Sequence, residues 1–221
     1  MKNTNRIGIG FIGGGFITRF HIKSLIGVRD CDVIGVMSKT RSSAEESCAL
    51  SKALGIGEAK PYNSVTEMVS DPSINALWIC APNFTRLEIM EEIVNAIESG
   101  KGELIGIACE KPLGRNVKEA KQMLALAKKV DLLDGYLENQ VFAPSVTKGK
   151  EIIWERGAST TGRPYLARAS EEHSGPHMPW FWEGELQGGG VLNDMMCHSV
   201  EEARFMLTAP KASRDSLTPL S

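Results

Sequence analysis

Short apolar runs that alternate with longer amphipathic segments constrain the fold of this 221-residue chain more than any other feature. The runs predict strands at residues 6–12, 31–37, 74–80, 103–109 and 132–138. The segments between and after them predict helices near residues 16–27, 42–54, 64–70, 84–99 and 116–130. Strand–helix alternation is typical of parallel strands joined by right-handed crossovers, with helices on both faces of the sheet. The sequence therefore predicts an α/β fold with a doubly wound parallel sheet.

The pattern changes after about residue 140, which indicates the start of a second domain. Residues 143–157 read as a linking helix, and residues 163–173 alternate well enough for a strand. A loop rich in Gly, Pro and Trp leads into an expected helix over residues 191–207. We therefore expect a first domain over residues 1–140 and the opening of an α+β domain over residues 141–221.

Composition sets limits on the partners of the chain. The hydrophobic fraction of 42% and the charged fraction of 24% are those of a soluble globular protein. A formal net charge of −2 gives no reason to expect nucleic acid or an anionic membrane as a partner. Five scattered cysteines without a CxxC motif favour reduced, buried thiols and a cytoplasmic location.

A glycine cluster stands between the first expected strand and the first expected helix. Gly13 and Gly15 occupy the first two positions of a GxGxxG pattern, and Thr18 stands at the third. The pattern follows a strand and opens a helix, as a dinucleotide-binding turn requires. A pyrophosphate would lie at the helix N-terminus, beside Phe16 and Ile17. The cluster predicts a Rossmann-type dinucleotide-binding domain, and the alternative is a purely structural glycine-rich turn.

The end of the second expected strand bears on the choice between NAD and NADP. An acidic residue there would bind the ribose 2′-hydroxyl of NAD, but the sequence has Ser38, Lys39, Thr40 and Arg41. Hydroxyl and guanidinium groups bind a 2′-phosphate, which an acid would repel. NADP is therefore slightly favoured over NAD, and a solvated basic loop is the alternative.

Four segments together carry a resemblance to a known family. They are "GFIGGGFITRFH" at 10–21, "ICAPN" at 79–83, "CEKPLGRNVKEA" at 109–120 and "GGGVLNDMMCHSVE" at 188–201. With these segments the chain resembles the Gfo/Idh/MocA family of NAD(P)-dependent oxidoreductases. The resemblance implies hydride transfer between NAD(P) and a hydroxyl-bearing carbon of a small-molecule sugar, cyclitol or related polyol.

The Glu-Lys-Pro triplet at the end of the fourth expected strand is central to this resemblance. In the family the triplet lies beside the nicotinamide ring, which implies that Glu110 and Lys111 contact the cofactor. The catalytic lysine of the family corresponds to Lys111, which would hydrogen-bond the reacting hydroxyl and assist proton transfer. The proline of the triplet, Pro112, is commonly a cis residue in the family.

Asp194 and His198 are four residues apart, so a continuous helix would place them on one face. The resemblance implies that both contact the substrate. His198 would be the general base, and Asp194 would bind a substrate hydroxyl or orient the histidine. Two alternatives are a surface ion pair and a metal site, although no third ligand is obvious.

Further positions follow from the same resemblance. Ala81, Pro82 and Asn83 match a loop near the cofactor, and Asn139 matches a position near the nicotinamide and the substrate. The family often has a histidine three residues after the matched asparagine, where this chain has Arg86. No role is transferred to that arginine.

Two tryptophans stand in the loop before the Asp/His helix. Aromatic faces stack on sugar rings, so Trp180 and Trp182 are candidate walls of a substrate pocket. They are read equally well as anchors that pack the loop.

The chain departs from the family in its length. Family members are usually longer, and their second domain is a mostly antiparallel sheet of which this chain holds about one strand. We therefore expect either a fragment or a reduced second domain, with a homo-oligomer only where the complete sheet is present. Two other functions stay open: an NAD-dependent glycosidase that uses transient oxidation and elimination, and a non-catalytic dinucleotide-binding protein or inactive fragment.

Overall fold

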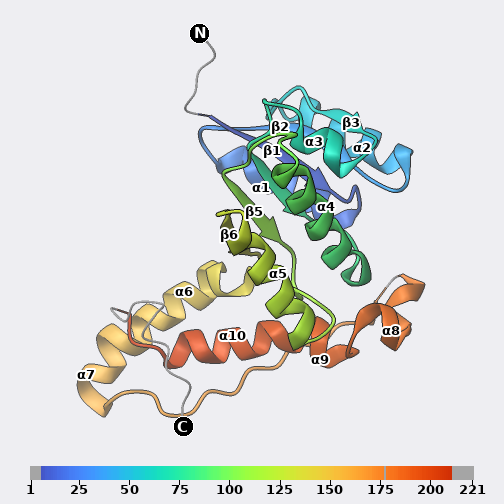
Figure 1. Cartoon of the computed structure of the whole chain (residues 1–221). Helices are drawn as coiled ribbons and strands as arrows, with labels where there is room; N and C mark the ends of the chain where they lie inside the picture. Colours follow the sequence, from blue (N-terminus) through green and yellow to red (C-terminus); the bar gives the residue numbers. More distant parts are fainter. Residues whose placement is uncertain (1–5, 177, 211–221) are drawn as a thin grey trace.

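The computed structural model describes residues 6–176 and 178–210 and contains a six-stranded parallel sheet with helices on both faces (Figure 1). The strand order β3-β2-β1-β4-β5-β6 is that of the doubly wound dinucleotide-binding fold. The strands are β1 (Ile7–Ile12), β2 (Cys31–Met37), β3 (Lys60–Tyr62), β4 (Ala76–Ile79), β5 (Gly106–Cys109) and β6 (Leu133–Tyr136). The predicted fold class is thereby confirmed for the first domain.

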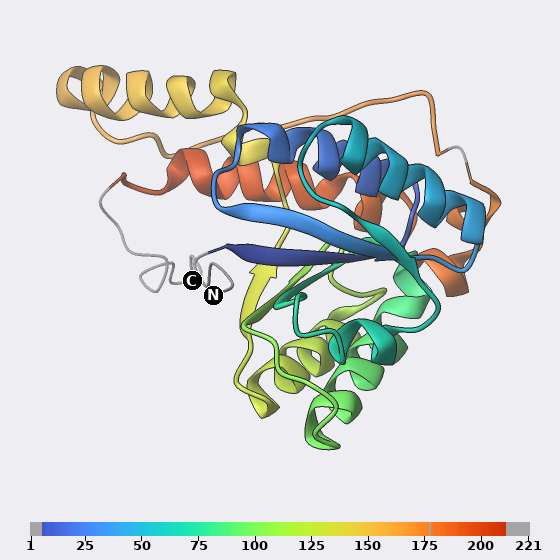
Figure 2. The same ribbon diagram turned by 90° about the horizontal axis from the view of Figure 1, so that it is seen from above.

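Helices on the two faces of the sheet bury two separate apolar clusters, and Figure 2 shows the helices above and below the strands. On one face lie α1 (Phe16–Ser24) and α2 (Arg41–Ala53), and on the other lie α3 (Val65–Val69), α4 (Arg86–Glu98) and α5 (Val117–Lys129). Phe11 belongs to the first cluster and its neighbour Ile12 to the second. The inner strands β1, β2, β4 and β5 are largely buried on both faces, which explains their continuous apolar runs, whereas the edge strand β6 is exposed.

The short strand β3 was missed by the sequence prediction. It has three residues, begins with an exposed lysine and contains Pro61. It pairs only with β2, at the edge of the sheet, where a proline is tolerated. No apolar run marks such a strand.

Short one-turn helices connect several of these elements. They are η1 (Leu25–Gly27), η2 (Asn83–Thr85), η3 (Gln140–Phe142) and η5 (Pro179–Trp182). Of these, η2 and η3 follow the carboxyl ends of β4 and β6, where the candidate site lies.

A helical rod follows the sheet, as expected for the linking helix, but it is longer and contains a π-helical section. It consists of α6 (Pro144–Glu151), η4 (Ile152–Gly157) and α7 (Ala158–Thr161). The indole nitrogen of Trp154 donates to the carbonyl of Met206 at 2.8 Å, which ties the rod to the last described helix. The two run beside each other in Figure 2.

The strand expected at residues 163–173 is wrong. The segment is irregular, and Tyr165 within it is 91% exposed. Alternation of apolar and polar residues shows only that a strand would be amphipathic. A strand also needs a neighbour for its N–H and C=O groups, and no described strand lies beside this segment.

The helix expected over residues 191–207 is interrupted at Met195. It forms as α9 (Val191–Asp194) and α10 (Met196–Leu207), preceded by α8 (Gly184–Gln187). Within the described ranges, no helix is long and apolar enough to span a bilayer.

Candidate active site

The glycine turn after β1 has the geometry that the sequence pattern predicts. Gly13 has φ +107°, and a Cβ there would lie 2.7 Å from the carbonyl oxygen of Cys80. A Cβ on Gly14 would meet the carbonyl oxygen of Ser43 at 2.7 Å. These two glycines let the turn pass close to neighbouring backbone. A Cβ on Gly15 would meet nothing within 4 Å, so this glycine faces open space.

Thr18, which replaces the third glycine of the pattern, is fully buried under the turn. Its hydroxyl donates to the carbonyl oxygen of Gly13 at 2.5 Å. The threonine is accommodated because its polar group is satisfied by the turn itself. The threonine that replaces the third glycine therefore links α1 to the glycine turn by a hydrogen bond.

The N-terminus of α1 fits a pyrophosphate group. Gly15 is the residue before the helix, and no side-chain hydrogen bond caps the first turn. The first-turn N–H groups, including those of Phe16 and Ile17, therefore have no side-chain acceptor and favour an anion. Phe16 is exposed there, and Ile17 packs on the apolar cluster beneath. Contact of either residue with the cofactor stays a prediction.

The basic loop after β2 lies next to this turn. Gly13 N donates to the carbonyl oxygen of Met37 at 2.7 Å, which joins the ends of β1 and β2. Ser38 is half-buried and Lys39 is exposed. Arg41 begins α2, and its guanidinium contacts Glu45 at 3.1 Å and Asn63 at 3.0 Å.

The loop after β4 holds the matched Ala81, Pro82 and Asn83. The amide of Asn83 is buried and donates to the carbonyl oxygen of Gln187 at 2.9 Å. This contact joins the loop to α8, across 104 residues of sequence. Asn83 therefore holds α8 against the loop after β4, and its predicted contact with the cofactor stays a prediction.

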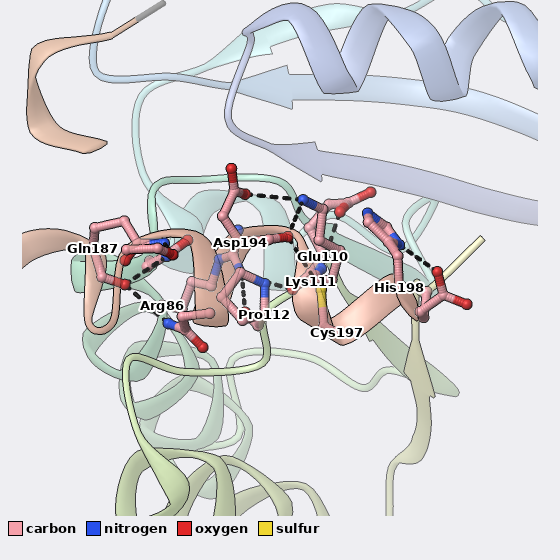
Figure 3. Close-up of polar contacts among 12 residues, drawn as sticks. Arg86, Glu110, Lys111, Pro112, Gln187, Asp194, Cys197 and His198 are labelled. Carbon is pink, nitrogen blue, oxygen red and sulfur yellow. Dashed lines mark hydrogen bonds and ion pairs between the residues drawn. The ribbon is translucent and has the colours of Figure 1, made fainter. Parts of the chain in front are cut away.

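Arg86 is a residue whose role sequence reasoning missed. Its guanidinium is buried, donates from Nε to the carbonyl of Ala81 at 2.8 Å, and donates from Nη1 to the carbonyls of Glu110, at 2.6 Å, and Pro112. Figure 3 shows it beside Pro112, under the loop after β5. One side chain thus holds the loops after β4 and β5 together. The only sequence signal was the unusual residue type at this position.

Glu110 is buried directly before the lysine. Its carboxylate contacts His21 Nε2 at 2.6 Å and accepts the backbone N–H of Lys111 at 2.9 Å. Both carboxylate oxygens are therefore engaged within the protein, and the predicted contact of Glu110 with the cofactor stays a prediction. His21, on α1, packs edge-to-face on Trp78 with ring centroids 5.1 Å apart.

The cysteines near the site have the character of packed thiols. Burial raises the pKa of the Cys109 thiol to about 11, and burial also raises the pKa of Cys80. All five cysteines are free, as the sequence predicts. A thiol with so high a pKa is a poor nucleophile at neutral pH.

Lys111 and Asp194 meet, although 83 residues separate them. Lys111 Nζ donates to Asp194 Oδ1 at 3.0 Å and to the carbonyl oxygen of Asp194 at 2.9 Å. The side chains are 21% and 17% exposed, so the pair is accessible to a small molecule. The peptide bond between Lys111 and Pro112 is cis, as the family resemblance implies.

His198 lies one turn beyond Asp194, in the first turn of α10 (Figure 3). Because the helix breaks at Met195, the two residues belong to separate helical pieces, α9 and α10. His198 Nδ1 contacts Glu138 Oε1, and both side chains are buried. Sequence reasoning missed Glu138. Throughout the part of the chain that the structure describes, no three His, Cys, Asp or Glu residues gather as metal ligands.

The aromatic loop packs largely on itself. Trp180 is half-buried, stacks on Phe181 with centroids 3.8 Å apart, and meets Phe84 edge-on at 6.0 Å. This packing is that of a loop anchor. Trp182 is 74% exposed, and Asn139 is exposed at the start of η3. Substrate or cofactor contacts of these residues stay predictions.

The fold and the site together define a class of protein. A parallel sheet in the order 3-2-1-4-5-6, an uncapped helix after a glycine turn, and a polar cluster at the carboxyl ends of the strands are the features of a Rossmann-type dinucleotide-binding protein.

Comparison with known proteins identifies the family. Residues 7–133 match the family model described as "Oxidoreductase family, NAD-binding Rossmann fold", and residues 157–216 match the "GFO/IDH/MocA C-terminal domain". The chain belongs to the Gfo/Idh/MocA family.

Curated relatives include two named sugar or cyclitol enzymes. A 1,5-anhydro-D-fructose reductase from Ensifer adhaerens is 30% identical over 90% of this chain and 56% of the relative. A myo-inositol 2-dehydrogenase from Thermotoga maritima is 27% identical over 90% of this chain and 54% of the relative. The chain thus spans about half the length of the curated relatives it matches.

Solved structures agree on the fold. GenD2 from gentamicin A biosynthesis, in complex with NAD, superposes with a TM-score of 0.78 at 25% identity, over 93% of this chain and 55% of that one. Levoglucosan dehydrogenase, in complex with NADH and levoglucosan, gives 0.68 at 25% identity, over 91% of this chain and 54% of that one.

Proposed function

We propose that this chain carries the cofactor site and the reacting residues of an NAD(P)-dependent oxidoreductase. The enzyme would move a hydride between the cofactor and a hydroxyl-bearing carbon of a sugar, cyclitol or related polyol. The observation that carries the proposal is the contact of Lys111 with Asp194 at the carboxyl end of β5, four residues before His198 in the sequence. Open α/β sheets bind their ligands at that edge.

Each residue of the cluster has a distinct role in this proposal. The bound nicotinamide supplies the hydride acceptor or donor. Lys111 hydrogen-bonds the reacting hydroxyl, and Asp194 holds the ammonium group in place or accepts a second substrate hydroxyl. His198 takes the hydroxyl proton as the carbon is oxidised. The backbone N–H groups of Phe16 and Ile17, at the start of α1, bind the pyrophosphate.

The substrate class rests on the names of the relatives. The relatives described above act, by their names, on an anhydro sugar and on an inositol, and one solved neighbour holds levoglucosan. All three compounds carry adjacent hydroxyl groups on a ring. The identities of 25–30% support this class and no single member of it.

For the cofactor we propose NADP ahead of NAD. The support is the absence of an acid over residues 38–41 together with the basic groups of Lys39 and Arg41 beside the glycine turn. The guanidinium of Arg41 contacts Glu45 on its own helix, so binding a 2′-phosphate requires it to exchange this exposed partner. Exposed ion pairs of this kind are weak, and the exchange costs little.

The first experiment is a titration of the purified chain with NADPH and NADH, followed by nicotinamide fluorescence. Turnover is then measured with myo-inositol, 1,5-anhydro-D-fructose and levoglucosan. Lys111→Ala is expected to lower turnover by about 10²-fold or more. The control Lys118→Ala removes an exposed lysine of α5 and is expected to change nothing.

Three results would redirect the proposal. Full activity of Lys111→Ala on a confirmed substrate refutes the role of the lysine. Tight cofactor binding without turnover of any polyol favours a non-catalytic binding protein. Release of sugar from an aryl glycoside without net change in NADH absorbance favours the glycosidase.

A further inference from the structure

We propose that Glu138 is the positioning residue of His198, and that it fixes the imidazole with its hydrogen on Nδ1. The nitrogen available to the substrate is then Nε2. This inference rests on the proposed function of His198 as the general base. It adds a residue that the sequence patterns do not single out, and it specifies which nitrogen of the histidine reacts.

The two side chains form a buried pair between the first domain and the last helix. Glu138 lies two residues beyond the end of β6, and His198 lies in the first turn of α10. They are 5% and 6% exposed. A buried carboxylate is costly unless a partner compensates its desolvation, so this contact is a specific arrangement.

The hydrogen bonds around the carboxylate determine where the imidazole hydrogen lies. Glu138 Oε1 accepts the backbone N–H of Gln140 at 3.0 Å and contacts His198 Nδ1. A backbone N–H can only donate, so Oε1 acts as an acceptor in this bond. An ionised carboxylate is an acceptor only. Nδ1 must therefore carry a hydrogen, because two acceptors form no bond.

The other nitrogen is left for chemistry. The described residues give His198 Nε2 no hydrogen-bond partner. Among the described residues, the fully buried side-chain polar atom without a hydrogen-bond partner is Glu138 Oε2, and Nε2 of His198 is not such an atom. With the hydrogen on Nδ1, a neutral imidazole presents a lone pair on Nε2, which can accept a proton. The adjacent carboxylate then stabilises the imidazolium that forms.

The unpaired oxygen argues against a purely structural role for Glu138. Glu110, one strand away, has hydrogen-bond partners for both of its carboxylate oxygens. Glu138 leaves Oε2 buried and unpaired among the described residues, which costs stability. An arrangement that gives up stability in a candidate site is expected where a residue serves function.

The test reads the tautomer directly, by a long-range ¹H–¹⁵N NMR spectrum of the chain labelled with ¹⁵N-histidine at neutral pH. The chain has only four histidines, and His198→Asn identifies the signals of the fourth. We expect a pyrrole-like Nδ1 and a pyridine-like Nε2 in the wild-type protein. In Glu138→Ala we expect this preference to disappear, whereas Glu138→Gln, which keeps an acceptor oxygen, retains it. The control Glu103→Ala removes an exposed carboxylate and leaves the spectrum unchanged.

The outcomes are decisive without any substrate. A wild-type spectrum with the hydrogen on Nε2 overturns the inference, and so does an unchanged tautomer in a folded Glu138→Ala variant. Where that variant does not fold, the wild-type and Glu138→Gln spectra still decide. The proposed function fails independently, through lack of turnover with the expected tautomer present. Where turnover exists, Glu138→Ala is expected to lower kcat by about 10- to 100-fold, with KM changed by less than about threefold.

Discussion

The buried guanidinium of Arg86 allows a quantitative prediction about what holds the Glu-Lys-Pro loop in place. Arg86→Met keeps most of the apolar stem and removes the guanidinium that contacts the carbonyls of Ala81, Glu110 and Pro112. Each hydrogen bond from a charged donor contributes about 1.5–3 kcal/mol. Relief of the desolvation of the guanidinium offsets part of that sum, so we expect a net loss on the order of 3–5 kcal/mol.

Urea unfolding followed by tryptophan fluorescence measures this loss. Arg86→Lys keeps the charge but has no planar fork to span three carbonyls, so an intermediate loss is expected. Arg29→Met is the matched control, because Arg29 is exposed. A loss below about 1 kcal/mol in Arg86→Met, the scale of an ordinary surface substitution, would show that the carbonyls need no charged clamp.

Further predictions concern the glycine turn, acid stability and the cofactor. Gly13→Ala is expected to lower the unfolding free energy by more than about 2 kcal/mol in urea titrations, because φ is +107° and the Cβ meets a carbonyl oxygen. Gly15→Ala is expected to keep the melting temperature and weaken NADH binding in fluorescence titrations, because its Cβ occupies open space. Burial opposes ionisation of Asp71, but hydrogen bonds from Tyr62, Ser73 and Lys60 outweigh it and lower its pKa. The contribution of ionised Asp71 to the unfolding free energy is therefore fully present above the unfolded pKa of about 4 and is lost as pH falls toward the lower pKa of the folded state. Asp71→Asn is expected to flatten the loss of unfolding free energy below that pH. Arg41→Ala is expected to weaken NADPH binding about tenfold in the same titrations and to leave NADH binding unchanged.

The part of the fold that could be predicted is the part in which local pattern and burial agree. The inner strands β1, β2, β4 and β5 are largely buried on both faces, so apolar runs predict them, whereas β6 has an apolar run although its residues are exposed. The helix at residues 117–129 shows its apolar stripe clearly. The prediction of a strand at residues 163–173 failed because a strand must pair with a second strand, and the pattern of one segment does not show whether a partner exists. The break at Met195 was not predicted, because the sequence on both sides of it continues the same helical periodicity.

The residues of the candidate site were also predictable only in part. Lys111, Asp194 and His198 were predicted from spacing and family resemblance, and the structure brings the lysine and the aspartate into contact. Arg86 and Glu138 were not predicted, because their roles depend on partners in distant loops. A buried arginine and an exposed one have the same letter, and only the fold distinguishes them.

The polar contacts of the site also have a mechanical consequence. The bonds of Lys111 with Asp194, Asn83 with Gln187 and Glu138 with His198 each cross from the sheet to the segment that ends in α10. The residues proposed to react therefore also help to hold this segment on the sheet. Removal of the Lys111, Asp194 or His198 side chain is therefore also expected to weaken the attachment of α10, which amide hydrogen exchange would detect as faster exchange in that helix. Conversely, a ligand that draws Lys111 away from Asp194 would break one of these bonds, so ligand binding would directly weaken the attachment of α10 to the sheet.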